Sequence, residues 1–374
     1  MTTRRTALAA TVLALAFAVS APAATILGTD GKPSGSSGWD PGFASGPNGT
    51  VRAIAVSGSD VYVAGDFTMV NGVAANRVAR WDGSQWHPLG SGMNATVYAL
   101  AVSGNTVYAG GNFETAGGVS ARRVARWDGS QWHPMGTGAN TVVLALAVDG
   151  GDVYAGGGFS TMGGVPVNRL ARWDGSQWHP MGTGVNSYVQ TLVAKGGTVY
   201  AGGIFTLSGG LPVRRIAKWE GSQWLPLGEG VNDPSGWPVV YAIALVNDNV
   251  YVAGGFYYAG GSRVNHIARW DGSQWHPVGS GLNGGGAGAL AFNGGNLYVG
   301  GGFDQAGGIQ ANRIAMWGCQ KIACTTPGWS ALATGTNDGV LALAASGGKV
   351  FAGGDFTTAG GLPSERFGIW REPR

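Results

Sequence analysis

One nine-residue stretch returns along this chain at a nearly constant interval. It reads Arg-Trp-Asp-Gly-Ser-Gln-Trp-His-Pro at 126–134, and close copies begin at Arg80, Arg172, Lys218 and Arg269. Two degenerate copies follow. The first tryptophans of the seven copies are Trp81, Trp127, Trp173, Trp219, Trp270, Trp317 and Trp370. Steps of 46 to 53 residues are typical of one four-stranded propeller blade, so the repeat predicts a propeller.

Each repeat predicts four antiparallel strands, called a, b, c and d in chain order. In the second copy, strands a and b are Val97–Val102 and Thr106–Gly110, and strands c and d are Arg123–Trp127 and Gln131–Met135. We expect Asp128-Gly129 to form a two-residue type I′ turn whose flanking tryptophans pack between blades. Outside the N-terminus no segment has a sustained helical apolar period, so the fold class is all-β.

The two ends of the repeat region complement each other. The stretch from Trp39 to Phe43 resembles a strand d with no a, b or c before it, and the last copy ends after strand c, at Trp370. One terminus can therefore finish the other's blade, which removes open sheet edges. The sequence predicts a seven-bladed β-propeller over residues 36–374, closed by an N-terminal strand that completes the last blade.

The first 35 residues have a different composition from the repeats. Residues 1–23 combine Arg4 and Arg5 with an apolar run and a small-residue cleavage site, which is typical of a signal peptide. Residues 24–35 are expected to be a flexible lead. We therefore predict a secreted protein, or one held in the periplasm or at the cell surface, with no membrane insertion after the signal is removed.

Charge excludes one class of partner. Without Arg4 and Arg5 the chain has 21 basic and 20 acidic residues. A near-neutral chain has no basic surface that would recruit nucleic acid or anionic membrane. The 70 glycines fall at repeated places, such as Gly110-Gly111 and Gly117-Gly118, and so indicate tight turns within a globular protein, which we expect to be a monomer.

The recurring glycine doublets and aromatic residues resemble those of a known group of proteins. The segments are Tyr108–Phe113, Ala116–Gly118 and Arg126-Trp127. They resemble the kelch/galactose-oxidase type of β-propeller, in its secreted bacterial form, and are also similar to the fungal cortical cell-polarity marker propeller. The resemblance covers residues 36–374 and implies a fold that hosts many unrelated functions.

Galactose oxidase would imply a copper site with histidine and tyrosine ligands. Four of the five histidines here occupy one repeat position on four different blades: His87, His133, His179 and His276. The fifth, His266, replaces a repeat arginine. We therefore expect no cofactor and no metal site.

Two polar rows recur with the repeat. Asparagines in the d-to-a crossovers could line a lectin-like pocket, or could serve their own loops. Arginines that begin strand c, among them Arg169 and Arg215, could capture an acidic ligand. A second basic row stands three residues on. Alternatively, these basic residues stack on tryptophan or pair with the turn acids Asp82, Asp128, Asp174, Glu220 and Asp271. The asparagines are Asn94, Asn140, Asn186, Asn232, Asn283 and Asn337, with Asn48 at the closing blade.

Two insertions interrupt the repeat. The first, 232–238, lengthens the crossover after the fourth copy and adds Trp237, which is the single best candidate for a ligand contact. The second replaces an Asp-Gly turn with 319–324, whose ends are the only cysteines. In an exported protein Cys319 and Cys324 are expected to form a disulfide.

These features predict a non-catalytic protein that binds an extracellular glycan or protein on one loop face, with the site near the fourth and fifth blades. The rival is a secreted glycosidase or lyase with a site at the mouth of the central channel. No pair of carboxylates is set apart by its sequence environment, so binding without catalysis is preferred.

Overall fold

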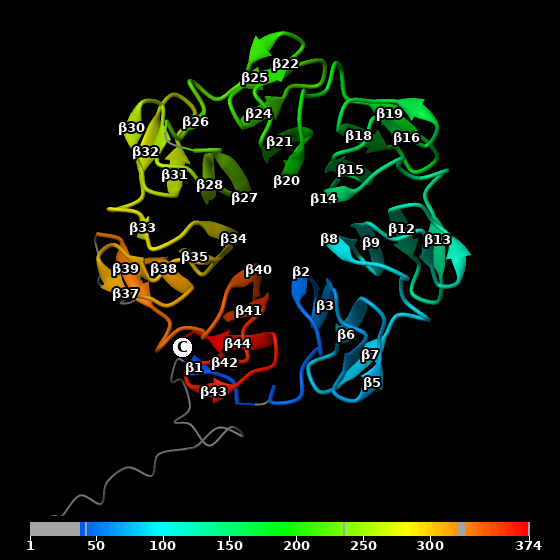
Figure 1. The fold of residues 1–374 in the computed structure, drawn as a ribbon, viewed down its shortest axis with the longest axis horizontal. Coiled ribbons are helices and arrows are strands. Elements are labelled where there is room, and N and C mark those ends of the chain that lie inside the picture. Colours follow the sequence, from blue (N-terminus) through cyan, green and yellow to red (C-terminus); the bar gives the residue numbers. More distant parts are fainter. Residues whose placement is uncertain (1–37, 42, 235, 320–325, 373–374) are drawn as a thin grey trace, which may run out of the picture. The chain divides into compact units, whose positions relative to one another are not determined.

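The computed structural model describes residues 38–41, 43–234, 236–319 and 326–372. The predicted signal peptide at 1–23 and lead at 24–35 lie outside these ranges. Within them no residue is helical, and the strands form seven four-stranded antiparallel sheets. Figure 1 shows these sheets arranged around a central axis, each running outward from an innermost strand. The prediction of an all-β propeller fold is confirmed.

Each sheet takes its strands in the predicted order. The innermost strands are β2 (Val51–Ser57), β8 (Val97–Ser103), β14 (Val143–Asp149), β20 (Val189–Lys195), β27 (Val239–Val246), β34 (Ala287–Asn293) and β40 (Val340–Ser346). The second strands are β3 (Asp60–Gly65), β9 (Thr106–Gly111), β15 (Asp152–Gly157), β21 (Thr198–Gly203), β28 (Asn249–Gly255), β35 (Asn296–Gly301) and β41 (Lys349–Gly354).

The outer half of each sheet holds the tryptophan motif. The third strands are β6 (Val78–Trp81), β12 (Val124–Trp127), β18 (Leu170–Trp173), β24 (Ile216–Trp219), β31 (Ile267–Trp270), β38 (Ile314–Gly318) and β44 (Phe367–Arg371). The fourth strands are β7 (Trp86–Pro88), β13 (Trp132–Pro134), β19 (Trp178–Pro180), β25 (Trp224–Pro226), β32 (Trp275–Pro277), β39 (Gly328–Ala331) and β1 (Gly38–Trp39). We number the sheets as blades one to seven in the order of their innermost strands.

The last sheet joins the two ends of the described chain. β1 pairs antiparallel with β44, so that Trp39 lies opposite Trp370. Trp39 is buried, and its indole N–H donates to the carbonyl of Leu332, which follows β39. Asp40 accepts a hydrogen bond from Arg371 at 2.6 Å.

The turn between the third and fourth strands differs from the prediction. Trp127 pairs with Trp132, so the loop has four residues, and only Gly129 in it has a positive φ, 103°. The prediction of a two-residue type I′ turn is therefore wrong. The reason is the Asp128 carboxylate, which accepts the backbone N–H groups of Ser130 and Gln131 at 2.8 and 2.9 Å and so stabilises a wider turn.

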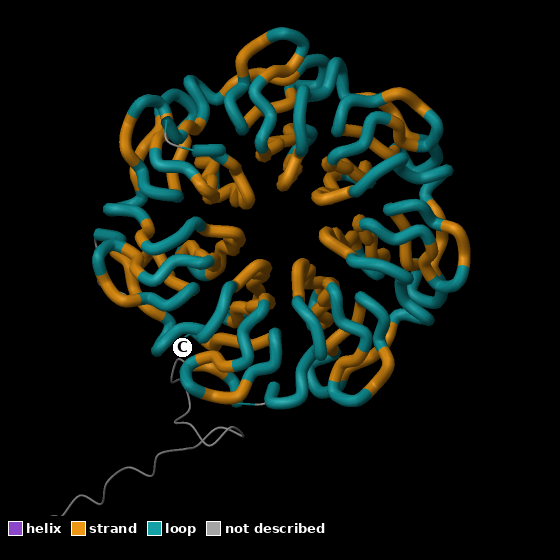
Figure 2. Tube along the Cα trace, viewed as in Figure 1, coloured by secondary structure: helices purple, strands orange, loops and turns teal. Residues whose placement is uncertain are grey.

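The connection between the second and third strands forms a small hairpin, in addition to the four strands expected in each repeat. In the second blade Ala116 pairs with Val119 around Gly117 and Gly118, whose φ values are 60° and 82°. Two positive φ values in a two-residue loop define a type I′ turn, which explains the glycine doublet. Figure 2 shows strand segments of this kind at the rim of every blade. They are β4–β5 (Met69–Val70, Val73–Ala74), β10–β11 (Thr115–Ala116, Val119–Ser120), β16–β17 (Thr161–Met162, Val165–Pro166), β22–β23 (Leu207–Ser208, Leu211–Pro212), β29–β30 (Tyr258–Ala259, Ser262–Arg263), β36–β37 (Gln305–Ala306, Ile309–Gln310) and β42–β43 (Thr358–Ala359, Leu362–Pro363), joined in two blades by β26 (Val231–Asn232) and β33 (Leu282–Asn283).

The core lies between neighbouring blades, and the second tryptophan of the motif anchors it. Trp132 is buried, whereas Trp127 is only half-buried and packs against it with ring centroids 5.5 Å apart. The indole N–H of Trp132 donates to the carbonyl of Leu89 in the preceding blade at 2.9 Å. The prediction that tryptophans pack between blades is confirmed for this residue.

Candidate functional site

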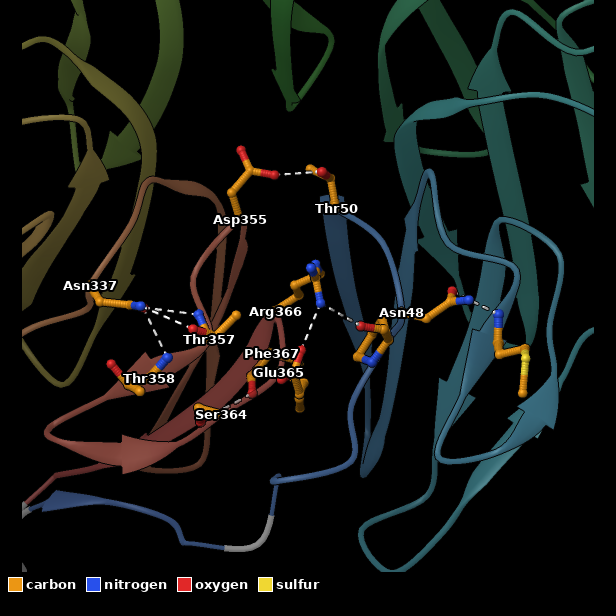
Figure 3. Close-up of polar contacts among 12 residues, drawn as sticks. Asn48, Thr50, Asn337, Asp355, Thr357, Thr358, Ser364, Glu365, Arg366 and Phe367 are labelled. Carbon is orange, nitrogen blue, oxygen red and sulfur yellow. Dashed lines mark hydrogen bonds and ion pairs between the residues drawn. The ribbon is translucent and has the colours of Figure 1, made fainter.

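Five of the seven predicted asparagines fasten a crossover to the blade that follows it. The Oδ1 atom of Asn337 accepts the backbone N–H groups of Thr357 and Thr358, both at 2.9 Å, and its Nδ2 donates to the Thr357 hydroxyl (Figure 3). The same pair of backbone contacts recurs at Asn48, Asn94, Asn140 and Asn186. These hydrogen bonds give the five asparagines a structural role, because the side-chain oxygen of each one is bound to the backbone of the outer hairpin in the following blade.

Two members of the row depart from this arrangement. Asn232 ends β26 and Asn283 ends β33, so both crossovers pair with the next hairpin as a third strand. The side chain of Asn283 reaches only Gln305 Oε1, at 3.4 Å. The asparagines are therefore not seven equal ligands around one pocket.

We expect Asn140→Ala to lower the free energy of unfolding by about 1 to 2 kcal/mol, since it leaves the N–H groups of Ser160 and Thr161 without their acceptor. Urea denaturation of the purified protein measures this. The matched control is Asn283→Ala, which loses one long contact and should change the stability by less than about 0.5 kcal/mol. Equal losses in the two variants would contradict the structural role.

The predicted arginine row begins the third strands with an unusual backbone. Arg77, Arg123, Arg169, Arg215, Arg313 and Arg366 all have φ between 57° and 70°, and His266 takes the place with φ 73°. The local reason is a close turn: the Arg77 N–H donates to the Phe67 carbonyl at 2.8 Å, while its own carbonyl accepts from Gly65. The Arg123 guanidinium forms an ion pair with Glu114, just before β10, at 2.6 Å.

Arg169 and Arg215, the two arginines predicted to contact a ligand, have different surroundings. The Nε atom of Arg169 is buried and has no hydrogen-bond partner among the described residues. Arg215 donates from Nε to the carbonyl of Pro238 at 3.3 Å, and so holds the end of the first insertion. Burial, together with the adjacent Arg214, lowers the pKa of Arg215.

The second basic row does not pair with the turn aspartates, so that part of the prediction is wrong. Arg80 bonds Asp60 at 2.9 Å because Arg80 lies opposite Tyr62 in the sheet, which places Asp60 two residues along on the same face. Lys218, which bonds Glu220, is the exception. Asp128 instead faces His133 at 2.6 Å. Hydrogen bonds from the Gln131 backbone and His133 hold the pKa of Asp128 well below its usual range.

The fifth blade collects departures from the repeat. Trp237, in the insertion that precedes β27, is 92% exposed, more than any other large apolar side chain in the described ranges. His266 is buried against Tyr257, with ring centroids 4.6 Å apart, and burial lowers its pKa. Of the five exposed aromatic side chains described, four fall between residues 188 and 257: Tyr188, Trp237, Tyr241 and Tyr257.

These four aromatic residues lie at the same end of the sheets. Tyr188 and Trp237 belong to crossovers that lead into innermost strands, Tyr241 stands near the start of β27, and Tyr257 follows the end of β28. We call this end of the sheets the crossover face. Trp237 thus lies at the same end of the sheets as the other three aromatic residues. It directly precedes Pro238, whose carbonyl accepts the hydrogen bond from Arg215.

The remaining predicted residues concern the second insertion. Cys324 lies outside the described residues, so the disulfide between Cys319 and Cys324 stays a prediction.

Among the residues that the structure covers, histidines, cysteines and acids form no group of three that could hold a metal ion. The described chain also contains no helix of the length and apolarity that crossing a membrane requires.

Comparison with known proteins supports the fold. A family model described as a domain of unknown function (DUF5122) beta-propeller matches residues 60–81. No curated protein matches the chain. Among solved structures, the computationally designed Ika8 protein is similar at 17% identity, with a TM-score of 0.53 and coverage of 87% of this chain and 97% of that one.

Two natural structures share the arrangement. The extracellular domain of the one-component system BT4673 from B. thetaiotaomicron has a TM-score of 0.58 at 11% identity over 89% of this chain, which spans only 39% of that structure. The WD40 propeller domain of Doa1 has a TM-score of 0.54 at 11% identity, with coverage of 87% and 94%. At such identities the likeness shows the β-propeller fold alone.

Proposed function

We propose that this chain is an exported, non-catalytic binding protein that recognises an extracellular glycan or protein on the crossover face of a seven-bladed propeller. The observation that carries the proposal is that four exposed aromatic residues, Trp237 among them, lie on the crossover face of blades four and five. Aromatic side chains supply flat apolar area for sugars and peptides with little loss of conformational entropy, and a residue this exposed contributes little to the core.

The architecture supports a rigid platform. Seven four-stranded sheets and the pairing of β1 with β44 favour a ring of seven blades that the N-terminal strand closes. The glycine doublets favour a kelch-type relationship, and the signal-like N-terminus favours secretion. The BT4673 domain, a similar fold, is described as extracellular.

Binding is preferred over catalysis because the carboxylates with strongly lowered pKa values are aspartates that stabilise turns. Asp82, Asp128, Asp174 and Asp271 each have a lowered pKa, and each is held by its own turn. Their turns lie between the third and fourth strands, at the end of the sheets opposite the crossover face. A perturbed carboxylate with a complete set of turn hydrogen bonds is explained without a substrate.

Trp237→Ala should weaken binding at least about tenfold and leave the melting temperature unchanged, since a 92% exposed side chain buries little area. A glycan array identifies the strongest oligosaccharide, and calorimetry measures its Kd. Phe292→Ala is the matched control, because Phe292 is also exposed but stands near the opposite end of its strand. Release of sugar from the same oligosaccharides would instead support the glycosidase or lyase.

A further inference from the structure

Every innermost strand is irregular at the same point. In β8 the pairing with β9 shifts between Val97 and Ala99, so that Tyr98 is an extra residue without a partner. The same shift occurs in all seven innermost strands. A β-bulge re-aims a side chain and often lies beside a functional site. The seven bulge residues are Arg52, Tyr98, Leu144, Gln190, Tyr241, Gly288 and Leu341.

The bulge is also where the seven repeats disagree. The next residue is alanine in six copies and Thr191 in one, and the residue after that is always leucine or isoleucine. At the bulge itself the copies supply a cation, two phenols, an amide, two leucines and a glycine. A position that only shaped the ring would repeat with the ring, as the alanines do. The differences therefore indicate that these residues form an asymmetric surface with a role other than maintaining the fold.

All seven bulge residues line one cavity of about 500 Å³ at the crossover end of the central channel. Most of the other residues in its wall are glycines of blades five to seven. Below it, the ring of leucines and isoleucines lines the channel with aliphatic side chains. The volume lies within the range of small-molecule pockets.

Several of the wall glycines have no structural reason to be glycine. A Cβ atom on Gly302 would meet nothing within 4 Å, and one on Gly288 would meet only the Val340 carbonyl oxygen, at 3.8 Å. Neither has a positive φ. Nearby Gly301 is different, because its Cβ would lie 2.3 Å from the Gly286 carbonyl oxygen. The fold thus requires Gly301, whereas Gly288 and Gly302 keep the cavity open.

The charges at this mouth select the ligand class. Arg52 is paired with Asp66 at 2.7 Å and lies over the Tyr98 ring, 5.6 Å from its centroid. The Thr50 hydroxyl, just before β2, donates to the Asp355 carboxylate just after β41 at 2.5 Å (Figure 3). Arg52 is the one charged side chain among the residues that line the cavity, and the Asp66 carboxylate offsets its charge, so the wall offers no free cation to an acidic ligand. Tyrosine rings and an amide suit an uncharged sugar, which offers an apolar face and hydroxyl groups.

We propose that the bulge residues and the open glycines form a subsite for one uncharged sugar residue of a glycan. The chain of that glycan leaves the cavity past Tyr241, which is 47% exposed and follows the insertion of Trp237. This inference rests on the proposed binding function and deepens it. The cavity holds the terminal residue, and the aromatic residues of blades four and five contact the units that follow.

The test fills the cavity with residues that other blades already carry. Gly288→Leu copies Leu144 and Leu341, and Gly302→Ile copies Ile204 at the equivalent place. The control is Gly328→Leu on β39, where a Cβ also meets nothing within 4 Å. Each full-length variant is measured by calorimetry against neutral gluco-, galacto- and manno-oligosaccharides and against oligosaccharides that contain uronic or sialic acid, with the melting temperature as the check on folding.

We expect neutral oligosaccharides to bind the unaltered protein, both filling variants to weaken that binding at least tenfold, and Gly328→Leu to leave it unchanged. Glycan binding that Trp237→Ala reduces but the filling variants do not would overturn the cavity subsite and leave the proposed function standing. A preference for acidic oligosaccharides would overturn the charge argument. A protein that binds no glycan in either set would overturn the subsite, and failure with protein ligands as well would overturn the proposed function.

Discussion

A chain that lacks residues 36–50 should lose at least about 4 kcal/mol of its free energy of unfolding, or fail to fold cooperatively. The deletion removes β1, exposes the edge of β44, and takes Trp39 and Phe43 out of the core, where they are 2% and 4% exposed. Truncation of one buried tryptophan alone costs about 3 to 5 kcal/mol. The open edge adds a tendency to aggregate.

Urea denaturation followed by tryptophan fluorescence measures this loss. The control is a chain that begins at Ser36, which keeps every described strand. The point variant Trp39→Ala tests the same contact without shortening the chain, and should lose about 3 to 5 kcal/mol. If the deletion and the control melt cooperatively at one temperature, the N-terminal strand does not close the ring.

Trp224→Ala should destabilise the protein by about 3 to 5 kcal/mol, because this side chain is 2% exposed and its indole N–H bonds the Met181 carbonyl of the preceding blade at 3.1 Å. Trp224→Phe keeps most of the apolar area but removes the donor, so it should lose clearly less than the alanine variant. Trp237→Ala, at the exposed extreme, should lose less than about 0.5 kcal/mol. Equal effects at Trp224 and Trp237 would show that the indoles between blades do not hold the ring together.

The repeat made the strands and their order predictable because spacing and alternation report local structure. The tryptophan motif marks the third and fourth strands, and the turns follow from glycine. The outer hairpins carry strong type I′ signals, Asn71-Gly72 and Gly117-Gly118, although the predicted four-stranded unit does not include them. The mistake at Asp128-Gly129 arose because the aspartate side chain makes hydrogen bonds that a dipeptide rule does not include.

The candidate site was less predictable, and the reason is physical. Trp237 stands out in the sequence because it interrupts a repeat. The bulges do not, because a bulge is a property of the pairing between two strands, and neither β8 nor β9 alone reveals it. One signal was available, namely the disagreement of the seven copies at the position of Tyr98. The glycines offer a second signal, because the place of Gly301, which the backbone requires, is glycine in all seven copies, whereas the place of Gly302 is isoleucine at Ile204.

The indole bonds between blades have a consequence for how such a chain can be rearranged. Each donor reaches back to the blade before it, so successive blades meet head to tail, as subunits do in a heterologous ring. The described donors are Trp39, Trp132, Trp178, Trp224, Trp275 and Trp329. Only Trp39 reaches a partner, Leu332, that lies 293 residues away. In a closed ring any one of these interfaces could serve as the seam, so a circular permutant opened at another crossover, with the present ends joined, would keep the same set of neighbours.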